Sequence, residues 1–177
     1  MITGTVSNVR AVLRAYWYLR HADRVGTKVR VWGRPSIANR GKMCIGDRVR
    51  LDSRIATLEL VTDAGATLEI ETGTYINYGC SIGATRFVKI GPFCTIGTHV
   101  IIMDNNYHRL EPQRRQERPD SAPVTLGENV WLGARVIVLP GVTIGDCSVV
   151  GAGSVVTRDI PPHSLAVGLP AKVVRSI

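Results

Sequence analysis

Residues 126–160 read LGENVW LGARVI VLPGVT IGDCSV VGAGSV VTRDI when they are divided into groups of six. An aliphatic residue opens each group, and glycine follows four of these residues. A period of six fits neither an α-helix nor a strand with hairpin turns. It predicts short flat segments separated by tight corners, three of which close a triangular coil of about 18 residues. The sequence therefore predicts a parallel β-helix with stacked pairs 18 residues apart: Leu126 on Ile144, Leu132 on Val150 and Val138 on Val156.

The same pattern extends upstream with interruptions. Apolar residues recur six apart at Ile45 and Leu51, then at Leu58, Ala64, Ile70, Ile76 and Ile82, then at Ile90, Ile96 and Ile102. We expect a prism at residues 40–165, a lead-in segment at 1–39 and a tail at 166–177. The largest insertion, residues 103–124, is polar and contains three prolines. A solenoid extrudes such an insertion as a loop, and a long loop in a regular repeat is more often functional than decorative.

A short amphipathic helix is expected at residues 5–23. Val9, Val12, Leu13 and Tyr16 fall at helical spacing, with arginines between them. We expect this apolar face to pack on the open end of the prism and cover its unpaired strand edges. Peripheral contact with a membrane, through the aromatic residues 16–18 and the neighbouring basic residues, is the alternative.

The composition is that of a folded globular protein, with 45% apolar and 20% charged residues. The net charge of +8 favours an anionic partner without choosing among phosphates, nucleic acid, anionic lipid and a nucleotide-bearing cofactor. Nucleic-acid binding is not favoured, because the arginines are split between the helix and the loop without interleaved aromatic residues. The four cysteines are far apart in the sequence, which predicts reduced thiols. With no secretion signal or spanning segment expected, a cytoplasmic location is predicted.

The hexads, the loop that contains His108, the hexad that contains Trp131 and the tail AVGLPAKVVR occur together and in order. In this combination the chain, over roughly residues 70–177, resembles the hexapeptide-repeat acyltransferases. The resemblance is to the branch of galactoside, maltose and Nod-factor acetyltransferases and of bacterial polysaccharide O-acetyltransferases. It implies an all-β, left-handed parallel β-helix and a homotrimer with active sites between neighbouring prisms. Neither the handedness nor the number of subunits follows from the periodicity alone.

The resemblance also implies acetyl-CoA as the acyl donor and no metal. His108 would act as the general base on an acceptor hydroxyl, which would attack the thioester without a covalent acyl-enzyme. Asn77 would contact the acceptor, and the loop offers further candidates for this: Asp104, Asn105, and the cations Arg114 and Arg115, which would suit an acidic acceptor. The coenzyme site implied by the family comprises Trp131 and Ala134 at the thiol end, Ala152 along pantetheine, and Thr157, Arg158, Lys172 and Arg175 toward the adenine and phosphates.

Each assignment has a purely structural alternative. His108 would then be a solvated loop residue, Asn77 a corner asparagine with a left-handed backbone, Trp131 a packing residue, and the tail cations a solvated surface.

Taken together, the sequence predicts an O-acetyltransferase that acts on a saccharide or polysaccharide precursor. An amino-sugar N-acetyltransferase of the same fold and a non-catalytic trimeric scaffold are the alternatives. A zinc hydrolyase of the carbonic anhydrase type is disfavoured, because such a site needs three imidazoles and only His99 and His108 are candidates.

Overall fold

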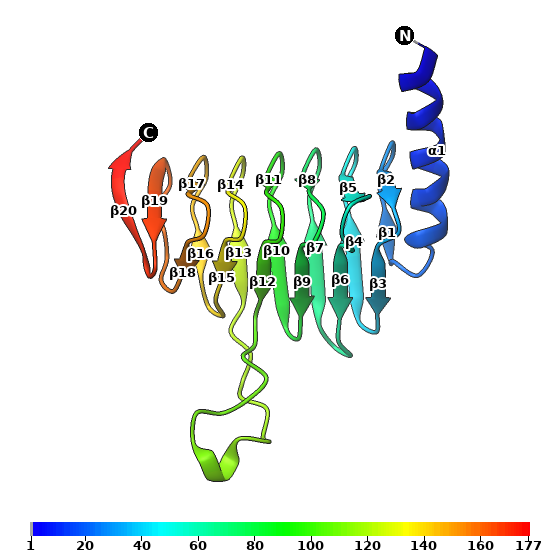
Figure 1. The fold of residues 1–177 in the computed structure, drawn as a ribbon. Helices are drawn as coiled ribbons and strands as arrows, with labels where there is room; N and C mark the ends of the chain where they lie inside the picture. The colour runs from blue at the N-terminus through cyan, green and yellow to red at the C-terminus, as the bar shows by residue number, and fades with distance from the viewer. Residues whose placement is uncertain (1) are drawn as a thin grey trace.

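The chain folds into a left-handed parallel β-helix of about seven coils, with a helix across one end. The computed structural model describes residues 2–177, and their side chains from residue 8 onward. Figure 1 shows the three sheets of the prism, the helix α1 at its N-terminal end and a long loop that leaves one edge. Of the described helices, none is long and apolar enough to cross a membrane.

Each coil contributes one strand to each of three sheets. The first sheet consists of β1 (Arg24–Val25), β4 (Lys42–Ile45), β7 (Thr67–Ile70), β10 (Phe87–Ile90), β13 (Val124–Leu126) and β16 (Thr143–Ile144). The second sheet consists of β2 (Arg30–Gly33), β5 (Arg50–Ser53), β8 (Tyr75–Ile76), β11 (Thr95–Ile96), β14 (Trp131–Leu132), β17 (Val149–Val150), β19 (Ser164–Gly168) and β20 (Ala171–Ser176). The third sheet consists of β3 (Ser36–Asn39), β6 (Glu59–Thr62), β9 (Ser81–Ala84), β12 (Ile101–Met103), β15 (Ile137–Val138) and β18 (Val155–Val156).

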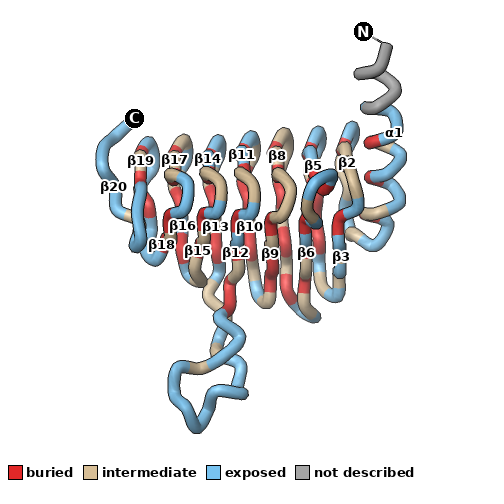
Figure 2. Tube along the Cα trace, in the orientation of Figure 1, coloured by how far each residue is buried: buried red, intermediate tan, exposed pale blue. Residues whose placement is uncertain are grey.

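The hexad aliphatic residues form the core. All three predicted pairs are confirmed: Leu126 pairs with Ile144, Leu132 with Val150 and Val138 with Val156. These side chains are almost fully buried, and Figure 2 shows the buried positions as a continuous interior along the prism. The hexad glycines allow the coils to approach closely: a Cβ on Gly133 would lie 2.6 Å from the backbone nitrogen of Ala152.

The prism begins earlier than the expected start near residue 40. The strands β1 to β3 form a complete coil, and Val25 pairs with Ile45, a separation of 20 residues rather than 18. Val25, Val31 and Ile37 are also spaced six residues apart, but this spacing is interrupted before Ile45, where the hexads of the next coil begin. The interpretation of Ala64 as an inward hexad residue is also wrong, because Ala64 is exposed in a turn.

Helix α1 (Ile2–Tyr18) ends before the expected residue 23, and it packs with a different face from the one expected. Its buried residues are Ala11 and Ala15, followed just beyond the helix by Leu19, and it contacts β2. Val9, Leu13 and Tyr16 are exposed. The small alanine side chains allow the helix to lie close to the first coil. Val12 and Tyr16 line the edge of this contact, whereas Val9 and Leu13 face away from it.

The loop and the C-terminal segment differ in structure. The loop joins β12 to β13 and contains one short 3-10 helix, η1 (Pro112–Arg114). The C-terminal segment extends the second sheet: β19 pairs parallel with β17, and β20 pairs antiparallel with β19.

Candidate active site

Asp104 fixes the base of the loop to the prism. Its carboxylate accepts hydrogen bonds from the backbone N–H groups of Thr85, Arg86 and Phe87 and from the Thr85 hydroxyl, at 2.7–2.8 Å. The residue is fully buried. All these donors lie at the turn between β9 and β10, so Asp104 joins the loop to the preceding coil. This structural role differs from the expected contact with an acceptor.

Asn105 is also buried and bound within the loop. Its amide donates to the carbonyl oxygen of Pro119 and to the Ser121 hydroxyl, both at 2.8 Å, and its side-chain oxygen accepts from the Tyr107 backbone. The two ends of the loop are thereby tied together. Asn105 was expected to bind the acceptor, but its polar atoms are already occupied inside the chain.

His108 lies on the exposed part of the loop, held by one side-chain hydrogen bond. Its Nδ1 is 2.9 Å from the carbonyl oxygen of Arg115. A carbonyl oxygen can only accept, so Nδ1 carries the proton in this bond. In the neutral imidazole the lone pair is then on Nε2. His108 also lines a shallow cavity of about 190 Å³ together with Asn106, Leu110 and Pro119.

The loop arginines are paired within the chain. Arg114 forms a 2.7 Å ion pair with Glu117, and the Arg115 guanidinium donates to the Leu110 carbonyl oxygen at 2.9 Å. Both cations were expected to face an acidic acceptor, whereas here they close the turn that holds His108.

Another loop arginine, Arg118, docks the loop on the prism. It forms a 2.6 Å ion pair with Asp63, which follows β6 at the corner between the third and first sheets of an earlier coil. The Arg118 guanidinium also lies 4.9 Å from the centre of the Tyr107 ring. The hexad spacing could not have identified this contact, because the two residues are 55 apart in the sequence.

A second group of expected site residues lies along the corner between the second and third sheets, which we call the second–third corner. Asn77 opens this corner after β8, Ala134 follows β14, and Ala152 follows β17. Successive coils stack there, as shown by the 2.8 Å bond from the Gly153 N–H to the Ala134 carbonyl oxygen. Asn77 is therefore about three strand spacings, roughly 14 Å, from Ala152 along the same edge.

On this side of the prism, Asn77 has a polar side chain and Trp131 exposes its aromatic ring. The side-chain oxygen of Asn77 accepts from the Tyr78 backbone at 2.9 Å, and no partner for its amide nitrogen is found in the described part of the chain. Trp131 points outward from the second sheet and is 54% exposed.

The outward row of the second sheet connects these two residues. Tyr75 pairs with Thr95, and Thr95 pairs with Trp131. Tyr75 and Thr95 were not among the residues predicted from the sequence, although each occupies the position just before a hexad aliphatic residue, as Trp131 does.

The expected coenzyme residues divide between two edges of the prism. Lys172 and Arg175 lie on β20, where they pair with Val167 and Leu165 in the same sheet as Trp131. Thr157 and Arg158 follow β18, at the corner between the third and first sheets. The His108 loop leaves the prism at this same corner, which we call the loop corner (Figure 1). One chain therefore places His108, Thr157 and Arg158 apart from the second–third corner.

Cys80 and Cys94 are buried inside the prism and are not exposed at either corner. Burial raises the pKa of the Cys80 and Cys94 thiols to about 11. Both thiols donate to backbone carbonyl oxygens, those of Gly97 and Gly127. Among the described side chains, no three histidine, cysteine or carboxylate groups are placed to hold a metal ion.

Comparison with known proteins relates this geometry to a family. Residues 123–158 match the family described as bacterial transferase hexapeptide (six repeats). A protein of Staphylococcus aureus (strain COL) that carries an acetyltransferase name is 41% identical over 150 residues, which cover 81% of this chain and 73% of that protein. The chain belongs to the hexapeptide-repeat acetyltransferases. The expected family, fold and enzyme class are thus confirmed.

Two further relatives of this acetyltransferase are informative. The galactoside O-acetyltransferase of Escherichia coli (strain K12) is 40% identical over 113 residues, covering 64% of this chain and 56% of that enzyme. A hexapeptide-repeat-containing acetyltransferase from Vibrio cholerae, solved with acetyl coenzyme A, superposes with a TM-score of 0.68 at 28% identity, covering 93% of this chain and 76% of that one.

Proposed function

We propose that this acetyltransferase transfers an acetyl group from acetyl-CoA to a hydroxyl group of a saccharide, with His108 as the general base. The observation that carries the proposal is the 2.9 Å contact between His108 Nδ1 and the Arg115 carbonyl oxygen. It holds the ring and leaves Nε2 as the proton acceptor, which is the arrangement a general base needs.

The reaction then proceeds in one addition and one elimination. The acceptor hydroxyl gives its proton to Nε2 as its oxygen attacks the thioester carbonyl carbon. The tetrahedral intermediate collapses with cleavage of the C–S bond, and the sulfur takes the proton back from the imidazolium. The products are an acetyl ester and coenzyme A, and no acyl-enzyme is formed.

The acceptor assignment rests on Asn77 and on the relatives. The unpaired amide of Asn77 suits a donor to a sugar oxygen, and oxygen acceptors are supported by the similarity to galactoside O-acetyltransferase. Asp104, Asn105, Arg114 and Arg115 are left out of the acceptor site, since each already binds a partner within the chain.

We assign the coenzyme to the outward face of the second sheet and the adjoining second–third corner. Trp131 and Ala134 would lie at the thiol end, Ala152 along pantetheine, and Lys172 and Arg175 near the phosphates, where cations are required. The acetyl-CoA bound to the Vibrio cholerae relative supports this donor.

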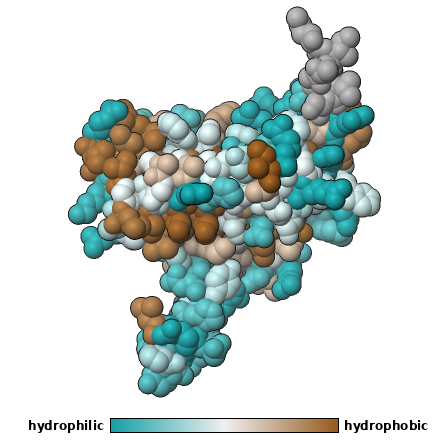
Figure 3. Space-filling model, in the orientation of Figure 1, coloured by the Kyte–Doolittle hydropathy of each residue, from teal (hydrophilic) through white to brown (hydrophobic). Residues whose placement is uncertain are grey.

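The separation of the two corners is explained if a second copy of the chain completes the site. The loop corner of one subunit, with His108, Thr157 and Arg158, would then face the second–third corner of its neighbour. The third sheet lies between the two corners, and its outward row contains Ile101, Ile137 and Val155. Figure 3 shows this part of the surface as hydrophobic. Such a patch suits burial between subunits of the closed trimer expected from the family.

The test is an acetylation assay with purified protein, acetyl-CoA and a panel of saccharides, amino sugars and sugar nucleotides. Acceptor mass and free thiol are followed together. We expect a product 42 mass units heavier, about the mass of one acetyl group less a hydrogen, on an oxygen of a saccharide. Acetylation of amino groups alone would contradict the proposal, as would transfer that is unchanged in His108→Ala.

A further inference from the structure

The positive charge of the chain is concentrated at the helix end of the prism. Residues 1–50 contain eleven lysines and arginines and two carboxylates, whereas residues 51–177 contain eleven and twelve. The first fifty residues, which form α1 and the first coils, thus carry the whole net positive charge.

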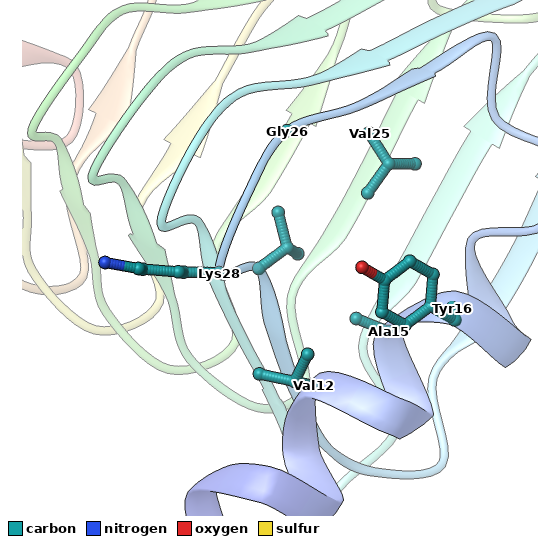
Figure 4. Close-up of a pocket in the computed structure, with 7 residues that line it drawn as sticks. Val12, Ala15, Tyr16, Val25, Gly26 and Lys28 are labelled. Atoms are coloured by element: carbon teal, nitrogen blue, oxygen red, sulfur yellow. The ribbon is translucent and has the colours of Figure 1, made fainter.

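The same end exposes large apolar side chains. Val9, Leu13, Tyr16 and Trp17 are 57%, 63%, 72% and 66% exposed. They lie on the side of α1 opposite Ala11 and Ala15, which pack on the first coil. In Figure 4 the helix and the first coil leave only a small cavity between them, of about 10 Å³, lined by Val12, Ala15 and Val25 among others. Tyr16 also lines this cavity, whereas Val9, Leu13 and Trp17 take no part in it.

Basic side chains flank the outer face, which we call the outer helix face and define as Val9, Leu13, Tyr16 and Trp17. On one side, Lys28 and Arg30 line an open groove of about 320 Å³ with Val9 and Leu13. On the other side, Arg10 and Arg14 follow at helical spacing. Arg20 lies 4.8 Å from the centre of the Trp17 ring. The described part of the helix contains no carboxylate.

We propose that the outer helix face binds the surface of an anionic lipid bilayer. Apolar and aromatic side chains flanked by arginine and lysine are the chemistry that inserts at the boundary between headgroups and acyl chains. The concentrated positive charge adds attraction to anionic headgroups. Because α1 lies across the end of the prism, the prism would stand on the bilayer by this end, with both corners of the active site facing water (Figure 1).

The two other candidates for this surface fit it less well. A second copy of the chain would bring two strongly positive ends together. Nucleic acid would be attracted by the positive charge, but its binding would not explain why the aliphatic residues Val9 and Leu13 are exposed.

The test is flotation of the full-length protein with phosphatidylcholine vesicles that contain either no anionic lipid or about 30% phosphatidylglycerol. The variants are Leu13→Ser/Trp17→Ser, which removes apolar surface from the outer helix face, and Ile55→Ser, a matched control at a residue that is 77% exposed elsewhere. Thermal melting by circular dichroism verifies that each variant is folded. We expect the wild type and Ile55→Ser to float with the anionic vesicles only. The double variant should bind at least about tenfold more weakly, and raising the salt from about 0.1 to 0.5 M should release the wild type.

Three results would overturn the proposal. These are failure of the wild type to float with either kind of vesicle, binding of the double variant as tight as that of the wild type, and self-association of the wild type through this face without binding to vesicles. Neither the assay nor its outcome depends on the acceptor or on His108, so failure here would leave the proposed function untouched.

Discussion

His108 is held by the Arg115 backbone carbonyl, which leaves Nε2 available for the proposed role as the base. If Nε2 is the base, replacing the ring by a methyl group removes the proton acceptor and leaves the coenzyme site intact. We expect His108→Ala to lower kcat by about 10²–10⁴-fold and to change the Kd for coenzyme A less than about twofold. Steady-state kinetics and calorimetry measure the two quantities. His21→Ala, at an exposed histidine beyond the end of the helix, is the matched control and should behave as wild type.

Cysteine reactivity is a second prediction at this scale. Because burial raises the pKa of Cys80 and Cys94 to about 11, both should remain thiols at pH 8 and resist a disulfide reagent until the protein unfolds. The half-exposed Cys147 should react in the folded state. The folded state holds these two protons more tightly than the unfolded chain. The free energy of unfolding should therefore fall as the pH rises from about 8.5, the ordinary thiol value, toward 11. Reaction of Cys80 or Cys94 in the native protein at pH 8 would contradict this.

Candidate site residues could be proposed from the sequence, but not the contacts that hold them. His108 and Asn77 could be proposed because they stand in recognisable motifs. Asp104 and Asn105 were placed with the acceptor because a sequence cannot show whether a polar loop residue is buried. Backbone partners such as the Arg115 carbonyl leave no trace in a side-chain pattern.

At the scale of elements, the loop depends on its buried anchor. Asp104→Ala would leave three backbone N–H groups and one hydroxyl without their acceptor. We expect the free energy of unfolding to fall by about 2–4 kcal/mol, measured by urea denaturation. Asp104→Asn, which keeps part of the acceptor capacity, should lose less. A loss below about 1 kcal/mol in Asp104→Ala would show that the anchor is unimportant.

The contact of Arg118 with Asp63 is expected to position the loop but to contribute little to the stability of the fold. Arg118→Asp should reduce kcat while changing the free energy of unfolding by no more than about 1 kcal/mol, since the pair is half-exposed. Exchanging both charges, Arg118→Asp with Asp63→Arg, should recover part of the activity. Lys89→Ala, which breaks the 3.1 Å pair with Glu71 on the first sheet, is the control. The explanation fails if the single variant and the control have equal kcat.

The elements differ in how well the sequence predicted them. Uninterrupted hexads fixed the stacking of residues 126–156, because each coil has the same length. The first coil was missed because its length differs from that of its neighbours. The face of α1 that packs was mispredicted because the helix has two apolar faces, and only the structure shows that the small residues lie inward.

For the whole molecule, the sequence predicted the prism, the loop and the capping helix, since each follows from local spacing. It gave no information on how copies of the chain combine. His108 and the second–third corner lie on different edges of one prism. This arrangement leads to the proposal that each active site is shared between two subunits.

Mixing two inactive variants tests this claim most directly. His108→Ala lacks the proposed base, and Ala152→Trp places a bulky ring at an exposed residue on the proposed pantetheine path. The two purified proteins are dissociated, combined in equal amounts, reassembled and assayed for acetyl transfer. If each site takes its base from one subunit and its coenzyme corner from the next, random assembly should restore about a quarter of the wild-type activity. A mixture as inactive as either variant alone would contradict a site shared between subunits.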